Sequence, residues 1–302
     1  MAVVRRFVRV AYKPRMATAE RAHKRLAAAK GSTEPPKKLT DRHDVRARLV
    51  DGFPVHTVTP RGITPQRSAI YLHGGAYISA IAPQHWALIG ALADAGVRVE
   101  VPHYGLAPQH THRDAYPLVT TVYRELLEEV DAATVTIAGD SAGGGLALGL
   151  AQTLREAGLP QPGRLVLLSP WLDLTISNPG VPAVEARDPW LSSTGLRVAG
   201  ESWAGGEDPT QPRLSPLNGP LDGLAPIDVS VGTREICLPD VLELQRRATA
   251  AGAEVQVEVC EGAVHVYPLT PTPEGRTAAH RIVDLIADRD TRTFHRRSTA
   301  DT

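Results

Sequence analysis

Residues 134–158 read TVTIAGDSAGGGLALGLAQTLREAG and decide the fold. The first six residues form a short apolar run that is typical of a buried strand, and the residues from 142 onward have the apolar spacing of a helix. Between the two runs, residues 139–143 (GDSAG) match a G-x-S-x-G pattern, in which a sharp strand-to-helix turn lifts the serine hydroxyl above the edge of a sheet. This context makes Ser141 a candidate nucleophile. A glycine-rich turn needed only for helix–strand packing is the alternative.

Strand and helix patterns alternate on both sides of this turn. Strand-like runs cover residues 45–50, 54–60, 68–75, 97–104, 134–139, 164–170, 227–233 and 253–260. Helix-like patterns cover residues 85–96, 115–130, 142–158, 239–252 and about 273–288. The alternation predicts an α/β fold with an eight-stranded, mostly parallel sheet and helices on both faces. Because Asp51-Gly52 suits a hairpin turn between the first two strands, we expect an antiparallel edge.

Composition and charge limit the range of functions. The 302 residues are 42% apolar, enough for a substantial core, and a formal net charge of zero gives no electrostatic support to nucleic-acid binding. Residues 1–40 nevertheless hold eleven Lys and Arg but only two Glu. Such a segment is typical of a solvated helical surface. The alternative is a basic amphipathic segment that contacts an anionic membrane surface.

The sequence predicts neither a membrane span nor a metal site. No apolar stretch approaches the roughly 18–20 residues that a span requires, and the first residues lack a signal-peptide pattern, so we expect a cytoplasmic protein. The two cysteines, Cys237 and Cys260, do not imply a disulfide framework, and no Cys/His cluster has zinc spacing. We therefore expect a site without metal or cofactor.

A second glycine-rich segment, residues 73–77 (HGGAY), lies at the end of the third predicted strand. The N–H groups of such a loop, with the N–H of the residue after a nucleophilic serine, can stabilise the oxyanion that forms when the serine attacks a carbonyl carbon. The sequence therefore predicts Gly74, Gly75 and Ala142 as oxyanion donors. A turn without this role is the alternative.

A general base for Ser141 is expected late in the chain, beyond the last strand. Three histidines follow the serine, and His265 alone lies in a loop just after a predicted strand, in EGAVHVYPL. The acid that orients the imidazole should follow the preceding strand, where Glu235 and Asp240 stand in VGTREICLPD. Glu235 comes first after the strand and is preferred on position, with Asp240 as the alternative acid.

Together these motifs resemble the hormone-sensitive-lipase branch of the α/β-hydrolases, also called bacterial type IV or GDXG esterases. HGGAY and GDSAGG (139–144) are similar to that family's oxyanion and nucleophile motifs, and EGAVHVYPL to its histidine motif. YGLAPQH (104–110) and SPWLDLT (169–175) resemble two further blocks of the family. The sequence departs from the family pattern in having Glu235 where Asp is usual and Ala76 where many members have glycine.

The resemblance implies hydrolysis of short- to medium-chain carboxylic esters through an acyl-enzyme. Asp140 matches a family position and is expected to brace the serine turn. Tyr77 and Trp190 are candidates for lining the substrate pocket, with a core role as the alternative for each. A lactone hydrolase with the same triad and a hydrolase-fold protein that binds a ligand without catalysis are the competing functions.

The resemblance also implies a domain organisation. We expect an N-terminal helical cap segment at residues 1–42 and a catalytic domain at 43–290. A further cap insertion is expected at about 176–215 and a polar tail at 291–302. A homodimer is expected by resemblance only.

Overall fold

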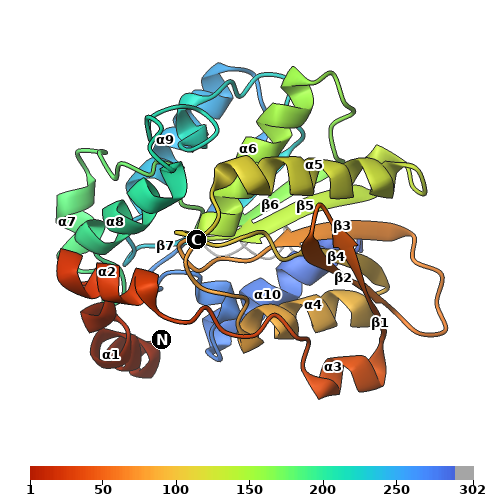
Figure 1. Cartoon of the computed structure of the whole chain (residues 1–302), viewed down its shortest axis with the longest axis horizontal. Helices are drawn as coiled ribbons and strands as arrows, with labels where there is room; N and C mark the ends of the chain where they lie inside the picture. Colours follow the sequence, from red (N-terminus) through yellow and green to blue (C-terminus); the bar gives the residue numbers. More distant parts are fainter. Residues whose placement is uncertain (290–302) are drawn as a thin grey trace, which may run out of the picture.

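An eight-stranded sheet forms the centre of the computed structural model, which describes residues 1–289; the predicted polar tail therefore lies outside the described residues. The strands are β1 (Asp44–Val50), β2 (Phe53–Thr59), β3 (Arg67–Leu72), β4 (Val97–Pro102), β5 (Val135–Asp140), β6 (Arg164–Leu168), β7 (Ile227–Gly232) and β8 (Val255–Cys260). Their order across the sheet is β1-β2-β4-β3-β5-β6-β7-β8 (Figure 1). β2 pairs antiparallel with β1 and β4, and all other neighbours pair parallel. The predicted mostly parallel sheet with an antiparallel edge is confirmed.

A two-residue turn sets the antiparallel edge. Val50 pairs with Phe53 across the hairpin, and Asp51 and Gly52 between them have positive φ values of 51° and 84°. This backbone is the type I′ turn that Asp-Gly favours, because its twist matches the twist of the flanking strands. The turn predicted from the sequence is therefore present.

Helices cover both faces of the sheet and create two core layers (Figure 1). The helices of the first layer are α5 (His112–Leu127), α6 (Ala142–Glu156) and α9 (Leu238–Ala250), and those of the second are α4 (Pro83–Asp94) and α10 (Pro273–Ile286). In β3, Ile70 and Leu72 contribute to the first core. Ala69 and Tyr71 contribute to the second, because successive side chains of a strand point to opposite faces. Both faces of the central strands are therefore buried.

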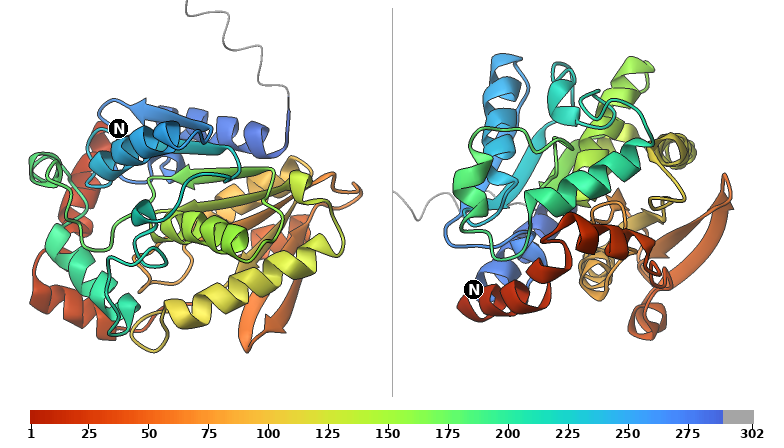
Figure 2. Two further views of the ribbon diagram at one scale, coloured as in Figure 1. Left: turned by 90° about the horizontal axis from the view of Figure 1, so that it is seen from above. Right: turned by 60° about the vertical axis from the view of Figure 1, so that its left-hand side comes forward.

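Two segments outside these layers lie against each other (Figure 2). Their helices are α1 (Ala2–Ala11), η1 (Lys13–Arg15) and α2 (Ala19–Ala27) before the sheet, and α7 (Val181–Glu185) and α8 (Ser193–Ala204) after β6. α2 packs along α8. Gly195 permits the close approach, because a Cβ at this position would lie 2.3 Å from the carbonyl oxygen of Met16. The two segments predicted to form a cap are therefore in contact with each other.

The remaining helices are short. They are α3 (Lys37–Arg42), η2 (Ala132–Thr134), η3 (Pro216–Asn218) and η4 (Tyr267–Leu269). Within residues 1–289, no helix combines the length and the apolar character needed to cross a bilayer.

Candidate active site

Ser141 stands at the sharp turn between β5 and α6. Its φ of 51° and ψ of −118° are unusual for a residue with a side chain. This conformation costs roughly 1–3 kcal/mol, so contacts with the surrounding structure must hold it in place. The flanking glycines are required by close approach. A Cβ on Gly143 would lie 2.0 Å from the carbonyl oxygen of Leu72, and a Cβ on Gly139 would lie 2.4 Å from that of Gly143. The predicted strand–turn–helix is present, with the serine at the carboxyl end of β5.

Ser141, His265 and Glu235 form a continuous hydrogen-bonded chain. His265 Nε2 lies 2.8 Å from Ser141 Oγ, and His265 Nδ1 lies 2.7 Å from Glu235 Oε2. Because an ionised carboxylate can only accept, Nδ1–H donates to Glu235 and the unprotonated Nε2 accepts from the serine hydroxyl. All three side chains are buried. They come from the loops after β5, β8 and β7, where the carboxyl ends of parallel strands meet.

Of the two candidate acids, Glu235 and not Asp240 lies against His265. Asp240 is in the first turn of α9, and its Oδ1 accepts a hydrogen bond from Asn178 Nδ2 at 3.0 Å. Burial raises the pKa of Asp240 to about 7 despite this hydrogen bond. Asp240 therefore joins the start of α9 to the segment after β6, and its carboxylate is bound to Asn178 rather than to the imidazole.

The surroundings of His265 favour its protonated form. Burial disfavours the charge, but the hydrogen bond and negative charge of Glu235 outweigh burial, with smaller contributions from Asp188 and Asp140. The pKa of His265 is therefore raised above its ordinary value of about 6.5. The imidazolium that forms when His265 takes up a serine proton is stabilised by the same carboxylates.

Ser169 is a site residue that the motifs did not identify. Its hydroxyl donates to Glu235 Oε1 at 2.8 Å and accepts from the N–H of Val266 at 2.9 Å. A second donor to Glu235 Oε1 is the N–H of Gly232, at 2.5 Å. Ser169 therefore fixes the acid and the loop of His265 at once. The signal available in the sequence was its place at the carboxyl end of β6, first in the SPWLDLT block.

The structure of the HGGAY loop differs from the predicted set of oxyanion donors at one residue, Gly74. The N–H of Gly74 donates to Asp140 Oδ1 at 2.9 Å, because the buried carboxylate requires donors, and it is not free for a substrate oxygen. Among residues 1–289, the N–H groups of Gly75, Ala76 and Ala142 have no acceptor. Gly75 and Ala76 both have positive φ, 123° and 54°. Gly75 and Ala142 thus remain candidate donors, and Ala76 takes the place of Gly74.

Asp140 connects the serine turn to the HGGAY loop. Besides the N–H of Gly74, its carboxylate accepts from Tyr71 Oη at 2.8 Å and lies 3.2 Å from His85 Nε2. Burial opposes ionisation of Asp140, but the charge of His85 and these hydrogen bonds hold its pKa below the usual range. One buried carboxylate thus braces the turn, as expected from the sequence.

The two candidate pocket residues, Tyr77 and Trp190, have different positions. The Tyr77 hydroxyl donates to the carbonyl oxygen of Ala142 at 2.7 Å, and its buried ring stacks on Trp203 with centroids 4.2 Å apart. Tyr77 therefore has the alternative core role, supporting the serine turn. Trp190 lies edge-to-face with His265, with ring centroids 5.9 Å apart, and so borders the site.

Asp188 ties the segment of Trp190 to the loop of Glu235. Its Oδ1 accepts from the N–H groups of Trp190 at 2.7 Å and Leu191 at 2.9 Å, and its Oδ2 accepts from the N–H of Ile236 at 2.9 Å. Burial raises the pKa of Asp188 to about 6, although these hydrogen bonds and His265 oppose the shift. The residue bordering the site and the acid of the site are therefore held by one carboxylate.

One group of side chains has the composition of a metal site. Glu235, Cys237 and His265 offer ligand atoms within 4.8 Å of one another. Glu235 and His265 already bind each other, and burial together with nearby carboxylates raises the pKa of the Cys237 thiol well above its ordinary value. A metal binds the thiolate and not the neutral thiol. The arrangement therefore fits the hydrogen-bonded chain better than a bound ion.

Comparison with known proteins assigns a family to this fold and site. The family model described as "alpha/beta hydrolase fold" matches residues 69–269, more than half of the chain. The chain belongs to the α/β-hydrolases. Within them, an acetyl-hydrolase from Streptomyces hygroscopicus is 38% identical over 218 residues, which cover 70% of this chain and 72% of that protein. An esterase from Acinetobacter venetianus is 31% identical over 249 residues, which cover 78% and 82%.

A solved structure places this α/β-hydrolase in one branch of the fold. The crystal structure of an esterase from the bacterial hormone-sensitive lipase family matches with a TM-score of 0.78 at 30% identity, covering 92% of this chain and 99% of that one. The resemblance inferred from the motifs is therefore confirmed. This α/β-hydrolase is a carboxylic ester hydrolase of the hormone-sensitive-lipase-like branch.

Proposed function

We propose that the protein hydrolyses short- to medium-chain carboxylic esters through an acyl-enzyme on Ser141. The observation that carries the proposal is the hydrogen-bonded chain from Ser141 Oγ through His265 to Glu235. A hydroxyl with a base in contact, and an acid that orients the base, is the arrangement that activates a serine for attack on a carbonyl carbon.

In the acylation step, His265 Nε2 takes the proton of Ser141 as Oγ attacks the ester carbonyl. Glu235 keeps the imidazole in the required tautomer and stabilises the imidazolium. The oxyanion is held by the N–H groups of Gly75, Ala76 and Ala142, each worth about 3–4 kcal/mol of transition-state stabilisation in comparable sites. His265 then protonates the departing alcohol, which leaves the acyl group on the serine.

In the deacylation step, water replaces the alcohol. His265 takes a proton from the water, the resulting nucleophile attacks the acyl carbon, and the same N–H groups hold the second oxyanion. Return of the proton to Ser141 Oγ releases the carboxylic acid and restores the free enzyme. Every proton in the cycle passes through Nε2, so a single base serves both steps.

Two observations support a small acyl group. Ser141 is only 8% exposed, and Trp190 borders His265 on one side, which limits the room beside the reacting atoms. The Streptomyces relative is named an acetyl-hydrolase. Both favour short acyl chains over long ones.

A panel of substrates tests this function. Turnover of p-nitrophenyl esters from acetate to palmitate is measured beside a series of lactones, for the wild type and for Ser141→Ala. We expect the highest kcat/KM with acyl chains of two to about eight carbons and loss of turnover in Ser141→Ala with the fold intact. Highest kcat/KM on a lactone would make the protein a lactone hydrolase, and absence of turnover on the whole panel would make it a ligand-binding protein.

A further inference from the structure

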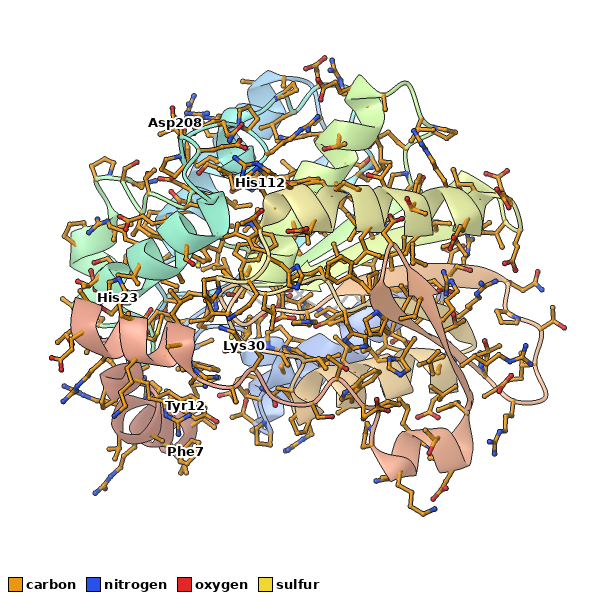
Figure 3. The ribbon with its side chains drawn as sticks, viewed as in Figure 1. Phe7, Tyr12, His23, Lys30, His112 and Asp208 are labelled. Carbon is orange, nitrogen blue, oxygen red and sulfur yellow. The ribbon has the colours of Figure 1, made fainter. Side chains whose placement is uncertain are left out.

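Helix α1 carries several apolar side chains that are exposed to solvent. Val3, Phe7 and Val10 are 83%, 58% and 73% exposed, and their spacing of four and three residues puts them in one row along the helix. Val8 is the one buried residue of α1. Figure 3 shows Phe7 at the outer edge of the molecule. We name Val3, Phe7 and Val10 the apolar row.

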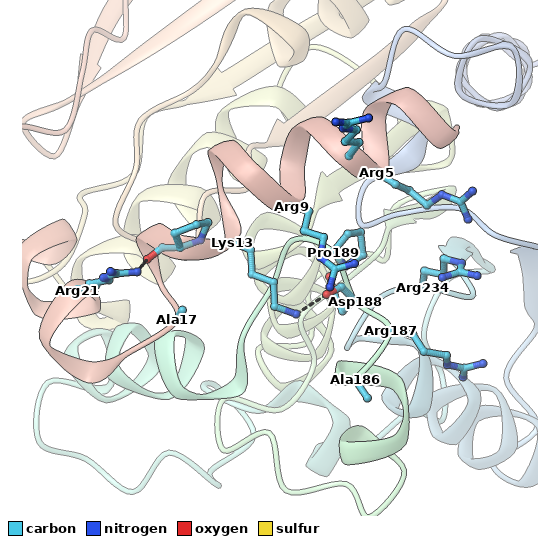
Figure 4. A pocket seen from close by; sticks show the side chains of 12 residues that line it. Arg5, Arg9, Lys13, Ala17, Arg21, Ala186, Arg187, Asp188, Pro189 and Arg234 are labelled. Atoms are coloured by element: carbon cyan, nitrogen blue, oxygen red, sulfur yellow. Dashed lines mark hydrogen bonds between the residues drawn. The ribbon is translucent and has the colours of Figure 1, made fainter.

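Cationic side chains occupy other faces of α1: Arg6 is next to Val3 and Val10, and Arg5 and Arg9 lie farther around the helix. Together with cations of other segments, they form a larger group. They line a pocket of about 670 Å³ between the N-terminal segment and residues 186–189 (Figure 4). We name them the cationic rim: Arg5, Arg6, Arg9, Lys13, Arg21, Arg187 and Arg234. Within residues 1–289, none of the seven forms a salt bridge with a carboxylate. This excess of positive charge attracts an anion from outside the chain.

One acidic residue, Asp188, also lines this pocket, and its single negative charge offsets at most one of the seven cations. Its carboxylate is occupied by three backbone N–H groups, and the contact from Lys13 is to its carbonyl oxygen. Residues 1–30 as a whole contain nine Lys and Arg against one Glu. The excess positive charge is therefore a property of the whole N-terminal segment.

The combination of row and rim distinguishes between possible occupants. A soluble anion would use the cations and leave the apolar row in water. A second copy of this chain, packed row against row, would bring two cationic rims together, and their repulsion would oppose the contact. An anionic lipid surface satisfies both features, because the apolar side chains enter the boundary between headgroups and acyl chains while arginines reach the phosphates.

We propose that α1 docks the protein on an anionic lipid surface, with the apolar row in the interface and the cationic rim on the headgroups. The docked helix would lie next to the active site. The ring of Phe7 packs edge-on against that of Tyr12, with centroids 5.8 Å apart, and the ring of Tyr12 lies tilted against that of Trp190, with centroids 5.4 Å apart. Trp190 in turn contacts His265 at 5.9 Å. The lipid-facing helix is thus separated from the imidazole by two aromatic rings.

Vesicle sedimentation tests the proposal with the full chain. Vesicles of phosphatidylcholine alone are compared with vesicles that contain 30% phosphatidylglycerol, at 50 mM and at 500 mM NaCl. We expect at least tenfold stronger partition onto the anionic vesicles at low salt and loss of most of this difference at high salt. The double variant Val3→Asp/Val10→Asp should bind the anionic vesicles at least tenfold more weakly.

Two matched control variants make the same changes in charge at exposed positions outside α1. Leu49→Asp/Ile63→Asp makes the same charge change at side chains that are 72% and 57% exposed in β1 and the loop after β2, and should bind as the wild type does. Arg6→Gln/Arg9→Gln should weaken binding severalfold. Arg124→Gln/Arg276→Gln removes two exposed arginines of other helices and should leave vesicle binding unchanged. Circular dichroism verifies that each variant is folded.

Three results would overturn the proposal: no partition of the wild type onto anionic vesicles at low salt, wild-type binding by Val3→Asp/Val10→Asp, or equal loss in the Leu49/Ile63 control. A dimer that dissociates in Val3→Asp/Val10→Asp, without vesicle binding, would assign the apolar row to a second copy. Hydrolysis of a soluble ester is measured in parallel. Because Ser141→Ala should bind vesicles normally, failure of docking and failure of catalysis are separate outcomes.

Discussion

Ser169 Oγ donates a hydrogen bond to Glu235 Oε1 at 2.8 Å, although the two residues are 66 positions apart in the chain. Glu235 has no exposed surface, so water cannot replace this donor. The same hydroxyl accepts from the N–H of Val266, which follows the imidazole in the chain. The acid and the base of the site are therefore positioned through one small side chain.

Replacing Ser169 with alanine should weaken both stability and catalysis. Ser169→Ala removes a hydrogen bond to a buried carboxylate, and we expect a loss of about 1–3 kcal/mol in the free energy of unfolding. We also expect kcat/KM to fall about tenfold, which corresponds to about 1.4 kcal/mol. Denaturant unfolding and ester kinetics measure both effects. Ser202→Ala, at a half-buried serine of α8, is the control, and an equal loss there would remove the special role of Ser169.

The pH profile of kcat/KM should report His265. The base works only when neutral, so activity is full above its pKa and falls as the pH drops through it. Because the pKa of His265 is raised, the acid limb should have its midpoint above 6.5. Glu235→Gln removes the charge that raises this pKa, and should move the limb to lower pH while kcat falls about 10²–10⁴-fold.

Asp240→Asn is the matched control for that experiment. Asp240 is a buried carboxylate that follows the same strand but is bound to Asn178. We expect its replacement to leave the acid limb in place and to change kcat less than Glu235→Gln does. A larger loss of activity in Asp240→Asn than in Glu235→Gln would show that Asp240, and not Glu235, is the acid.

Replacing Asp188 should disturb the border of the site without touching the reacting atoms. An amide in Asp188→Asn can accept on one side only, so at least one of the three N–H groups now bound is left without an acceptor. We expect a loss of about 1–3 kcal/mol in the free energy of unfolding and a drop of about tenfold in kcat/KM. Asp222→Asn, which breaks an exposed pair with Arg155, should cost less than about 1 kcal/mol. Equal losses in the free energy of unfolding for the two variants would contradict the role of Asp188 in holding the border of the site.

Buried histidines near the HGGAY loop should make the fold sensitive to acid. Burial lowers the pKa of His103 to about 3 and that of His73 to about 4. Since the unfolded chain binds these protons near pH 6.5, both residues contribute full stability above 6.5, and the free energy of unfolding falls as the pH drops from there toward 4. Two protons give a slope of up to about 2.7 kcal/mol per pH unit. His103→Asn should reduce the slope, whereas replacing the exposed His280 should not.

The strands and the serine turn could be predicted because their signals are local. Residues 134–158 contain the strand, the turn and the helix in one run, and Asp51-Gly52 defines its hairpin within four residues. The family motifs then predicted which other segments, the oxyanion loop and the histidine loop, lie near this turn. The base, His265, was found by its position after the last strand, which the parallel sheet converts into proximity to Ser141.

The errors and omissions came from contacts between distant segments. The N–H of Gly74 is engaged by a carboxylate 66 positions away, and no pattern within HGGAY shows that. Ser169 reaches Val266 across 97 positions. The choice between Glu235 and Asp240 also depended on how α9 starts relative to the sheet, because both follow the same strand. Such contacts appear only once the chain is folded.

The central claim, that Ser141 is activated by His265, is tested most directly by covalent labelling. The folded protein is treated with an excess of a fluorophosphonate at pH 8, and peptide mass spectrometry locates the adduct. We predict one adduct, on the peptide that contains Ser141, and at least a hundredfold slower labelling of His265→Ala with its fold retained. Labelling at another residue, or equally fast labelling of His265→Ala, would contradict the account.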